Sequence, residues 1–252
     1  MIFLDHPRAL FTMTLALLWI ASLFGAYLRK HYVPHQTVDE DHFNLVLGAA
    51  LTLLSLITGF TFSMAVSRYD QRKDYEEQEA NTIGTEYARL DVLPVADAVK
   101  VRAFLREYLN QRITYYSTTD ADLLHQSRNK TSQLQSELWS AVAAPAAVQP
   151  SPLSALVISG MNDVLNSEGY TEAAWRNRVP LAAWTLLICL ATFCNLLLGY
   201  RAYGTTSILF LVLPIVLAVS FFLIADIDSP RSGLIHVHAQ NLESLAYSLR
   251  PH

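Results

Sequence analysis

Four long apolar stretches constrain the fold of this chain more than any other feature of its sequence. They cover residues 9–28, 44–66, 180–200 and 205–225, and none carries an acidic or a basic side chain. A helix needs roughly 20 apolar residues to cross the hydrocarbon core of a bilayer, and in lipid it must satisfy its backbone hydrogen bonds internally. The first stretch exceeds the apolar region of a signal peptide, so we expect it to be retained. The sequence therefore predicts an all-α membrane protein with four transmembrane helices.

Composition and motifs argue against several other classes of protein. The net charge is −4, so the chain lacks the excess of basic residues that nucleic-acid binding needs. Cys189 and Cys194 are five residues apart in one apolar stretch and point in different directions on a helix, which disfavours a disulfide. The histidine pairs at 31 and 35 and at 236 and 238 match no metalloenzyme motif. We expect no cofactor, no bound metal and no enzyme activity.

The basic residues that flank the spans predict the orientation in the membrane. With four spans, both termini and the segment between the second and third spans lie on one side. That side carries seven basic residues near the spans, and the other side carries three. Because basic residues are more frequent on the cytoplasmic side, the first side is predicted to be cytoplasmic. The seven are Arg8, Arg68, Arg72, Lys73, Arg176, Arg178 and Arg231, and the three are Arg29, Lys30 and Arg201. We therefore expect two helices in residues 1–67, a cytoplasmic helical domain at 68–179, two helices in 180–228 and a cytoplasmic tail at 229–252.

The polar segment after the second span also reads as helical. Residues 67–90 contain no proline and a single glycine, so no stop signal separates them from the span. We predict that the second span continues as a stalk in one helix of some 45 residues, which ends at Pro94. Further helices are expected at 95–116, 121–142 and 153–167, with a Pro/Ala linker at 143–152. Gly169 should end the last of these, and another helix should run from Thr171 into the third span.

A stripe of small and polar residues runs along the second span at steps of three and four. On a helix these positions stay within about a third of the circumference. The same rhythm continues into acidic residues beyond the membrane. The stripe consists of Gly48, Thr52, Ser55, Gly59, Ser63 and Ser67, and its acidic continuation of Asp70, Asp74 and Glu77.

Two interpretations of the stripe remain open. Small residues at this spacing let transmembrane helices pack closely, and hydroxyls can bridge to neighbouring helices. Alternatively, several copies assemble with the stripe around an axis and line a pore, with Phe60 or Phe62 as a hydrophobic gate. The acids would then form rings that favour cations. They could equally be a solvated helix face, because basic residues are interleaved with them.

The fourth span ends in a second acidic pair, Asp226 and Asp228, followed by Pro230 and Gly233. This pattern is typical of a helix that leaves lipid and turns. Two carboxylates with nearby carbonyls could also attract a cation. Asn195 is the one amide in the apolar cores and should find a partner on another helix.

Three stretches of the chain carry a further set of motifs, GFTFSMAVSRYDQRKDYEEQEANTIGTEYARLDVLP at 59–94, MNDVLNSEGYTEAAWRNRVP at 161–180 and ADIDSPRSGLI at 225–235. Together they resemble a bacterial membrane family of unassigned function that is often labelled bestrophin-like. The resemblance implies a homo-oligomeric ion channel of the bacterial inner membrane, pentameric if the analogy with bestrophins holds, with the second span lining the pore. Bestrophins include anion-conducting and cation-conducting members, so the resemblance does not fix selectivity. The acidic cluster by which eukaryotic bestrophins clasp calcium is not found here.

These observations predict an oligomeric ion channel whose partners are the lipid bilayer, inorganic ions and further copies of the chain. The acidic mouth of the stripe favours cation conduction. The absence of charged residues within the spans argues against a proton-coupled transporter. The alternative is a membrane-anchored helical scaffold or signalling module that binds a partner protein through residues 68–179.

Overall fold

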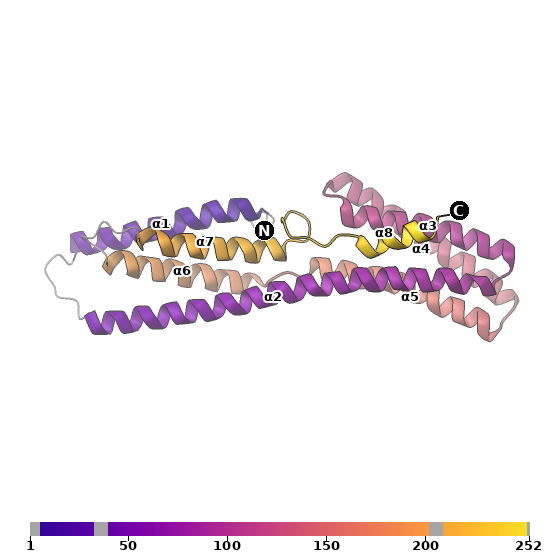
Figure 1. Ribbon diagram of the computed structural model, residues 1–252, viewed down its shortest axis with the longest axis horizontal. Coiled ribbons are helices and arrows are strands. Elements are labelled where there is room, and N and C mark those ends of the chain that lie inside the picture. Colours follow the sequence, from indigo (N-terminus) through magenta and orange to yellow (C-terminus); the bar gives the residue numbers. More distant parts are fainter. Residues whose placement is uncertain (1–5, 33–39, 202–208, 251–252) are drawn as a thin grey trace. The chain divides into compact units, whose positions relative to one another are not determined.

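The computed structural model describes residues 6–32, 40–201 and 209–250, and no strand occurs among them. Four of the helices are long and apolar enough to cross a membrane, which confirms the all-α fold class with four candidate spans. The elements are α1 (Pro7–Tyr32), α2 (Glu40–Arg89), the short 3-10 helix η2 (Leu90–Val92), α3 (Val95–Ser117), α4 (Ala121–Val148), α5 (Pro152–Arg176), α6 (Leu181–Arg201), α7 (Leu209–Asp228) and α8 (Gln240–Ser248) (Figure 1). The start of the fourth predicted span, residues 205–208, lies outside the described residues.

The chain divides into two compact units. The first, which we call the transmembrane unit, comprises residues 1–69 and 178–236. It holds α1, α6, α7 and the first part of α2. The second, which we call the polar unit, comprises residues 70–177 and 237–252 and holds the rest of α2 with α3, α4, α5 and α8.

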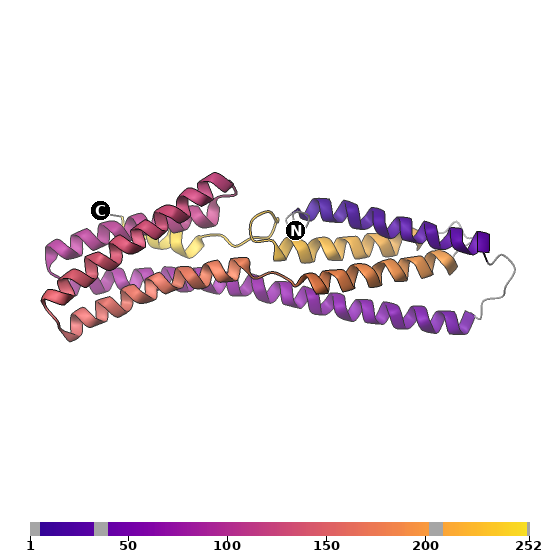
Figure 2. The ribbon, with the colours of Figure 1, turned by 180° about the vertical axis from the view of Figure 1, so that it is seen from behind.

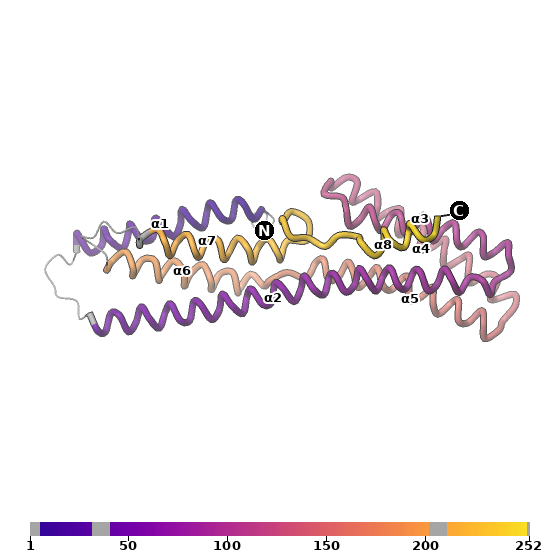
Figure 3. Tube along the Cα trace, in the orientation of Figure 1, coloured from indigo at the N-terminus to yellow at the C-terminus, as the bar shows by residue number. Residues whose placement is uncertain are grey.

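Helix α2 runs for 50 residues without interruption (Figure 3). At 1.5 Å per residue it is about 75 Å long, which confirms the predicted continuation of the second span as a stalk. Leu93 adopts an extended conformation, with φ −84° and ψ 158°. A residue that precedes proline avoids the helical region, so Pro94 accounts for the end of this helical run.

Helices α1 and α6 pack closely because glycine occupies two positions of their interface. A Cβ atom on Gly25 would lie 2.0 Å from the carbonyl oxygen of Leu196, and one on Gly199 would lie 1.8 Å from that of Ser22. Between these contacts the buried hydroxyl of Ser22 donates to Oδ1 of Asn195 over 3.4 Å. The predicted partner of Asn195 on another helix is thereby confirmed. Small residues and a shared hydrogen bond are typical of helix pairs in lipid.

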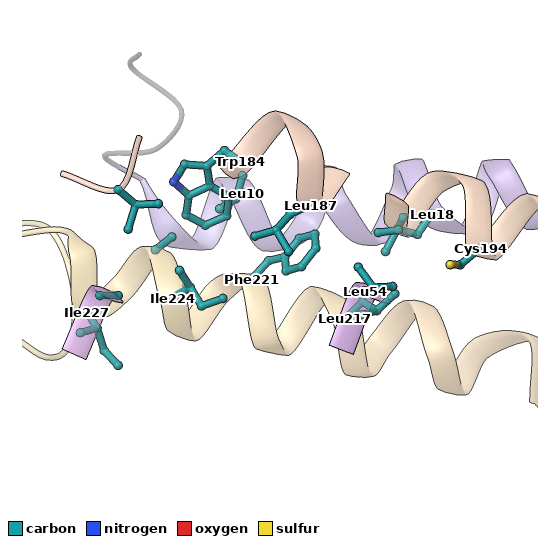
Figure 4. Close-up of a cluster of buried hydrophobic side chains, with 14 residues drawn as sticks. Leu10, Leu18, Leu54, Trp184, Leu187, Cys194, Leu217, Phe221, Ile224 and Ile227 are labelled. Atoms are coloured by element: carbon teal, nitrogen blue, oxygen red, sulfur yellow. The ribbon is translucent and has the colours of Figure 1, made fainter. Parts of the chain in front are cut away.

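The apolar core of the transmembrane unit lies where all four of its helices meet (Figure 4). Trp184 of α6 meets Phe221 of α7 edge to face, with ring centroids 6.2 Å apart. Leu18 of α1 and Leu54 of α2 are buried in the same cluster. Helix α2 is the outlying member of the unit, since 17% of its most apolar window is buried, compared with 50% for α7.

The polar unit is organised around a buried ion pair. Helices α3 and α4 lie side by side, and α5 packs against α4 (Figure 2). Arg112 of α3 donates through Nε and Nη2 to the carboxylate of Glu79 on α2, and neither side chain is exposed to solvent. Thr171 of α5 donates to the same carboxylate over 3.0 Å, and Tyr116 of α3 over 3.3 Å. One carboxylate thus ties three helices together.

Two predicted boundaries in this unit are wrong. The expected linker at 143–152 is mostly helix, because α4 continues through Pro145 to Val148. Four alanines surround this proline, and a proline in the last turn removes only one helical hydrogen bond. Helix α5 likewise passes through Gly169 and ends at Arg176, and α6 begins separately at Leu181. The chain breaks before Pro180 rather than at the glycine, because α5 buries Thr171, Ala174 and Trp175 beyond it.

The contact between α1 and α6 yields a testable prediction. We expect Gly199→Ala to lower the midpoint of thermal unfolding in detergent, because the new methyl group meets backbone that can move only with its helix. Overpacking of this kind costs about 2 kcal/mol. The matched control is Gly48→Ala on α2, where no heavy atom of the described residues lies within 4 Å of the new Cβ. The control should unfold at the wild-type temperature or slightly above it, and an equal loss in both variants would contradict the prediction.

Candidate ion pathway along helix α2

The polar stripe of α2 faces away from the rest of the transmembrane unit. The buried residues of this part of the helix, Leu47, Leu54, Thr61 and Ala65, share one face. At 100° per residue the centre of the stripe lies about 150° around the helix from them. All six stripe residues, Gly48, Thr52, Ser55, Gly59, Ser63 and Ser67, are exposed in the single chain.

The stripe is polar, and its glycines do not serve as close-packing positions against other helices of the same chain. Thr52 Oγ1 donates to the carbonyl of Gly48 over 2.8 Å, and Ser55 Oγ donates to that of Leu51 over 2.9 Å. These hydroxyls therefore use their protons within α2, and their oxygens still have lone pairs to offer outward. At Gly48 and Gly59 no heavy atom of the described residues lies within 4 Å of the position that a Cβ would take. Packing of this face against another copy of the chain remains a second interpretation.

One edge of the stripe opens into a groove between α2 and α7. The groove has a volume of about 470 Å³, and Ser55, Gly59 and Phe62 lie on its α2 side. Val216, Ser220 and Leu223 are among the α7 residues that line the other side. The groove is largely apolar, so it does not by itself form an aqueous path.

The two candidate gate residues lie on opposite flanks of the stripe. Phe60 has 62% of its surface exposed and Phe62 42%. Phe62 lines the groove against α7, whereas Phe60 is not among the groove residues. Phe60 therefore contributes less to the packing of its own chain and projects more freely.

The acidic continuation of the stripe is also exposed. Asp70, Asp74 and Glu77 lie on the same side of α2 as the stripe, and all three are exposed. Of the interleaved basic residues, Arg72 is turned inward and is 1% exposed. It donates to the carbonyl oxygens of Ala174 over 3.3 Å and of Asn177 over 3.1 Å at the end of α5. One of the cations that would neutralise the acidic face is therefore committed elsewhere.

Asp226 and Asp228 are placed differently from the other predicted ion-attracting residues. Both are buried, at 2% and 4% exposure. The carboxylate of Asp226 accepts from the backbone N–H groups of Leu234 and Ile235 over 2.8 and 2.9 Å. Both oxygens of Asp228 lie 3.1 Å from the N–H of Val179. These contacts give the two acids a structural part in the turn after α7, and we leave them out of the proposed pathway.

The turn after α7 depends on Asp226 for a physical reason. An acid in the last turn of a helix is disfavoured by the helix dipole, and here the two backbone donors of the returning chain offset that cost. Gly233 lets the chain come back this closely, since a Cβ there would lie 2.4 Å from the carbonyl oxygen of Asp226. Within the described residues no group of three or more His, Cys, Asp or Glu side chains could hold a metal ion.

Sequence reasoning did not identify the charged residues buried on the inner face of α2. Arg72, Glu76, Glu79 and Glu86 are each at most 1% exposed. Glu76 accepts from the backbone N–H groups of Asn241 and Leu242, over 2.9 and 3.0 Å, at the start of α8. The signal in the sequence is the alternating step of four and three residues, which continues the buried face of the span into the polar unit.

Comparison with known proteins places this architecture among known folds. A profile described as the Bestrophin-like domain matches residues 16–242. The chain is similar to the crystal structure of a bacterial bestrophin homologue from Klebsiella pneumoniae, with 16% sequence identity and a TM-score of 0.65, over 95% of this chain and 99% of that one. A single-residue variant of a K. pneumoniae homologue gives 14% identity and a TM-score of 0.68, over 95% and 97% of the two chains. No curated protein matches the sequence.

The geometry around Asp226 yields a second prediction. We expect Asp226→Ala to lower the free energy of unfolding by about 2 kcal/mol, because two backbone N–H groups lose a buried, charged acceptor. The matched control is Asp74→Ala, an exposed acid on α2, which should change stability by less than about 0.5 kcal/mol. Thermal or denaturant unfolding in detergent measures both. A neutral effect of Asp226→Ala would show that the turn does not need the carboxylate.

Proposed function

The chain belongs to the bestrophin-like family, and we propose that several copies assemble around the polar face of α2 to form an ion channel that favours cations. The family is one of channels rather than enzymes, which supports a channel-like function in general. The observation that carries the proposal is the direction of the stripe. Its six residues are exposed in the single chain, and the stripe is centred on the side of α2 opposite to the buried face, with one edge at the groove against α7.

A polar face on an outlying membrane helix needs a partner other than lipid. Hydroxyl groups and bare glycine backbone gain nothing from contact with acyl chains, and polar residues within spans normally face a bundle interior or a water-filled cavity. A ring of copies would bring the stripes together around one axis. Thr52, Ser55 and Ser63 would then offer oxygen atoms to a passing ion at successive depths.

A hydrophobic constriction and a charged entrance complete the proposed pathway. The projecting ring of Phe60 could narrow the axis and gate it by dewetting, with Phe62 on the opposite flank of the stripe as the second candidate. Asp70, Asp74 and Glu77 would place three rings of negative charge at the end of the span and concentrate cations there. By the excess of basic residues we place this end in the cytoplasm, together with both termini, and we expect the host membrane to be the bacterial inner membrane.

The scaffold alternative rests on one feature of the polar unit. A hollow of about 450 Å³ lies between the start of α3 and the turn that joins α4 to α5. Val95 and Val148 beside it are 81% and 80% exposed, and exposed apolar residues of this kind can serve a protein partner. Crosslinking in native membranes separates the alternatives, because a scaffold would yield a different protein and a channel would yield symmetric self-oligomers.

The channel proposal is tested first by the accessibility of single introduced cysteines. Cys189 and Cys194 are replaced by alanine, and either Ser63→Cys on α2 or Ile20→Cys on α1 is introduced. We expect a charged, membrane-impermeant thiol reagent to reduce K⁺ flux into liposomes several-fold with Ser63→Cys, because that position would face the water-filled axis. Ile20 lies on α1, outside the proposed pathway, is exposed in the single chain and is the matched lipid-facing control.

Two outcomes would contradict the proposal. One is an absence of flux for K⁺, Na⁺, Ca²⁺ and Cl⁻ across pH and voltage. The other is modification of Ser63→Cys that proceeds no faster than modification of Ile20→Cys. The second outcome, together with a stable oligomer, would favour the packing interpretation of the stripe.

Selectivity provides a separate prediction. We expect the double substitution Asp74→Asn and Glu77→Gln to lower the permeability ratio of K⁺ to Cl⁻ several-fold, because two rings of negative charge at the entrance are removed. The reversal potential under a KCl gradient measures this ratio. The effect should shrink at high salt, where exposed charges are screened. Asp97→Asn on α3 is the control, and an equal change in both variants would argue against an acidic entrance.

A further inference from the structure

The inner face of α2 carries four buried charged residues, and one of them differs from the other three. Arg72, Glu76 and Glu79 each bond to groups of other helices of the polar unit. Glu86 is as deeply buried, with a side-chain exposure of 0%. Neither of its carboxylate oxygens has a hydrogen-bond partner among the residues that the structure describes. A buried carboxylate without a partner is costly, so its situation needs an explanation.

The carboxyl group of Glu86 occupies a notch that a glycine leaves in α5. A Cβ on Gly160 would lie 1.9 Å from Oε2 of Glu86 and 2.3 Å from Nη1 of Arg89. The glycine therefore makes room for both side chains at the contact between α2 and α5. The side chain of Glu86 has no exposed surface, so water reaches the carboxyl group only if the groups packed around it move.

Two charged groups act on Glu86 from the helices that pack around it. Nη1 of Arg89, one turn further along α2, lies 3.7 Å from Oε2, which is too long for a hydrogen bond. Asp163 of α5 acts on Glu86 with a second negative charge. Burial raises the pKa of Glu86 to about 8, with Arg89 lowering it and Asp163 raising it. Nearby charge thus opposes the effect of burial only in part.

We propose that Glu86 is a proton-binding site, and that loss of its proton loosens the contact between α2 and α5 at Gly160. The ligand is a single proton, and no other group is transferred. With the proton bound, the neutral carboxyl group fits the notch without a hydrogen-bond donor. Once ionised, the carboxylate draws in water or the guanidinium of Arg89, and the close contact at Gly160 must widen to admit either. The inference concerns the polar unit alone and does not depend on ion conduction.

The sign of the pH dependence follows from linkage. The pKa of Glu86 in the folded chain lies above its ordinary value of 4.5. The stabilising contribution of the protonated group is therefore fully present below about pH 4.5 and is lost as the pH rises through about 8. A glutamine at this position stays neutral throughout. We expect wild type and Glu86→Gln to unfold at similar temperatures near pH 5, and wild type to unfold at the lower temperature above pH 8.

The proton itself can be observed directly in the full chain. Infrared difference spectra between acidic and alkaline buffer should contain a protonated-carboxyl stretch that disappears with a midpoint near pH 8. This band should be absent from Glu86→Gln and retained in Glu77→Gln, which alters an exposed acid on the same helix. A band that persists in Glu86→Gln would overturn the assignment, and so would parallel unfolding profiles of wild type and Glu86→Gln across the pH range.

Two neighbouring substitutions keep the test informative even if Glu86→Gln folds poorly. Arg89→Gln removes the charge that favours ionisation, so the infrared midpoint should move to higher pH. Asp163→Asn removes the charge that opposes ionisation, so the midpoint should move to lower pH. A purely structural role of Glu86 would not produce opposite shifts. Midpoints that stay in place, or that move in the same direction, would overturn the proposal.

Discussion

Helix α2 has to satisfy two environments with a single unbroken backbone, and the other elements are arranged around this requirement. In its first half, the buried face of α2 contributes Leu54 and Ala65 to the apolar core of the transmembrane unit. Beyond the span the same face continues at steps of four and three, but it carries Arg72, Glu76 and Glu79. Each of these needs a partner, because a buried charge is tolerated only when it is compensated. The contacts at the end of α5, at the start of α8 and along α3 are those partners.

This requirement explains why the polar unit is built from helices that start or end against α2. The guanidinium of Arg72 meets backbone carbonyls at the end of α5, where the helix dipole is negative. The carboxylate of Glu76 meets backbone N–H groups at the start of α8, where the dipole is positive. Charge on α2 and dipole on the partner helix match at both places. Removing one member of such a pair destabilises the fold, because the other member stays buried without a partner and keeps its full desolvation penalty.

The sequence was sufficient to predict the spans, the long stalk and the fold class, because all of these depend on long apolar runs and on the positions of proline. It was not sufficient where a side chain far away in the chain decides the outcome. The interleaved charges of residues 68–77 predict either rings at a pore entrance or a solvated face, and neither interpretation buries a charge inside the polar unit. Only the structure brings Arg112 to Glu79. The close contact of Gly199 with Ser22 likewise depends on a helix more than 170 residues away. The helix ends predicted at Gly169 and before Pro145 were wrong. Burial of the residues after Gly169 outweighs its low helix propensity, and alanines on both sides of Pro145 favour helix.

The motifs that resemble the family turn out to have different physical roles. Glu79 and Gly84 belong to the run EANTIGT, and both serve contacts inside the polar unit, Glu79 with Arg112 and Gly84 with Leu245. Asp226 and Gly233 close the turn after α7. The run from Thr61 to Asp70 is buried at Thr61 and Ala65, half-buried at Val66, Arg68 and Tyr69, and exposed at its other positions. Residues that bond to other parts of the chain stabilise the fold. The exposed polar face of α2 makes no such contribution. The function is therefore to be sought along the part of α2 that its own chain leaves uncovered.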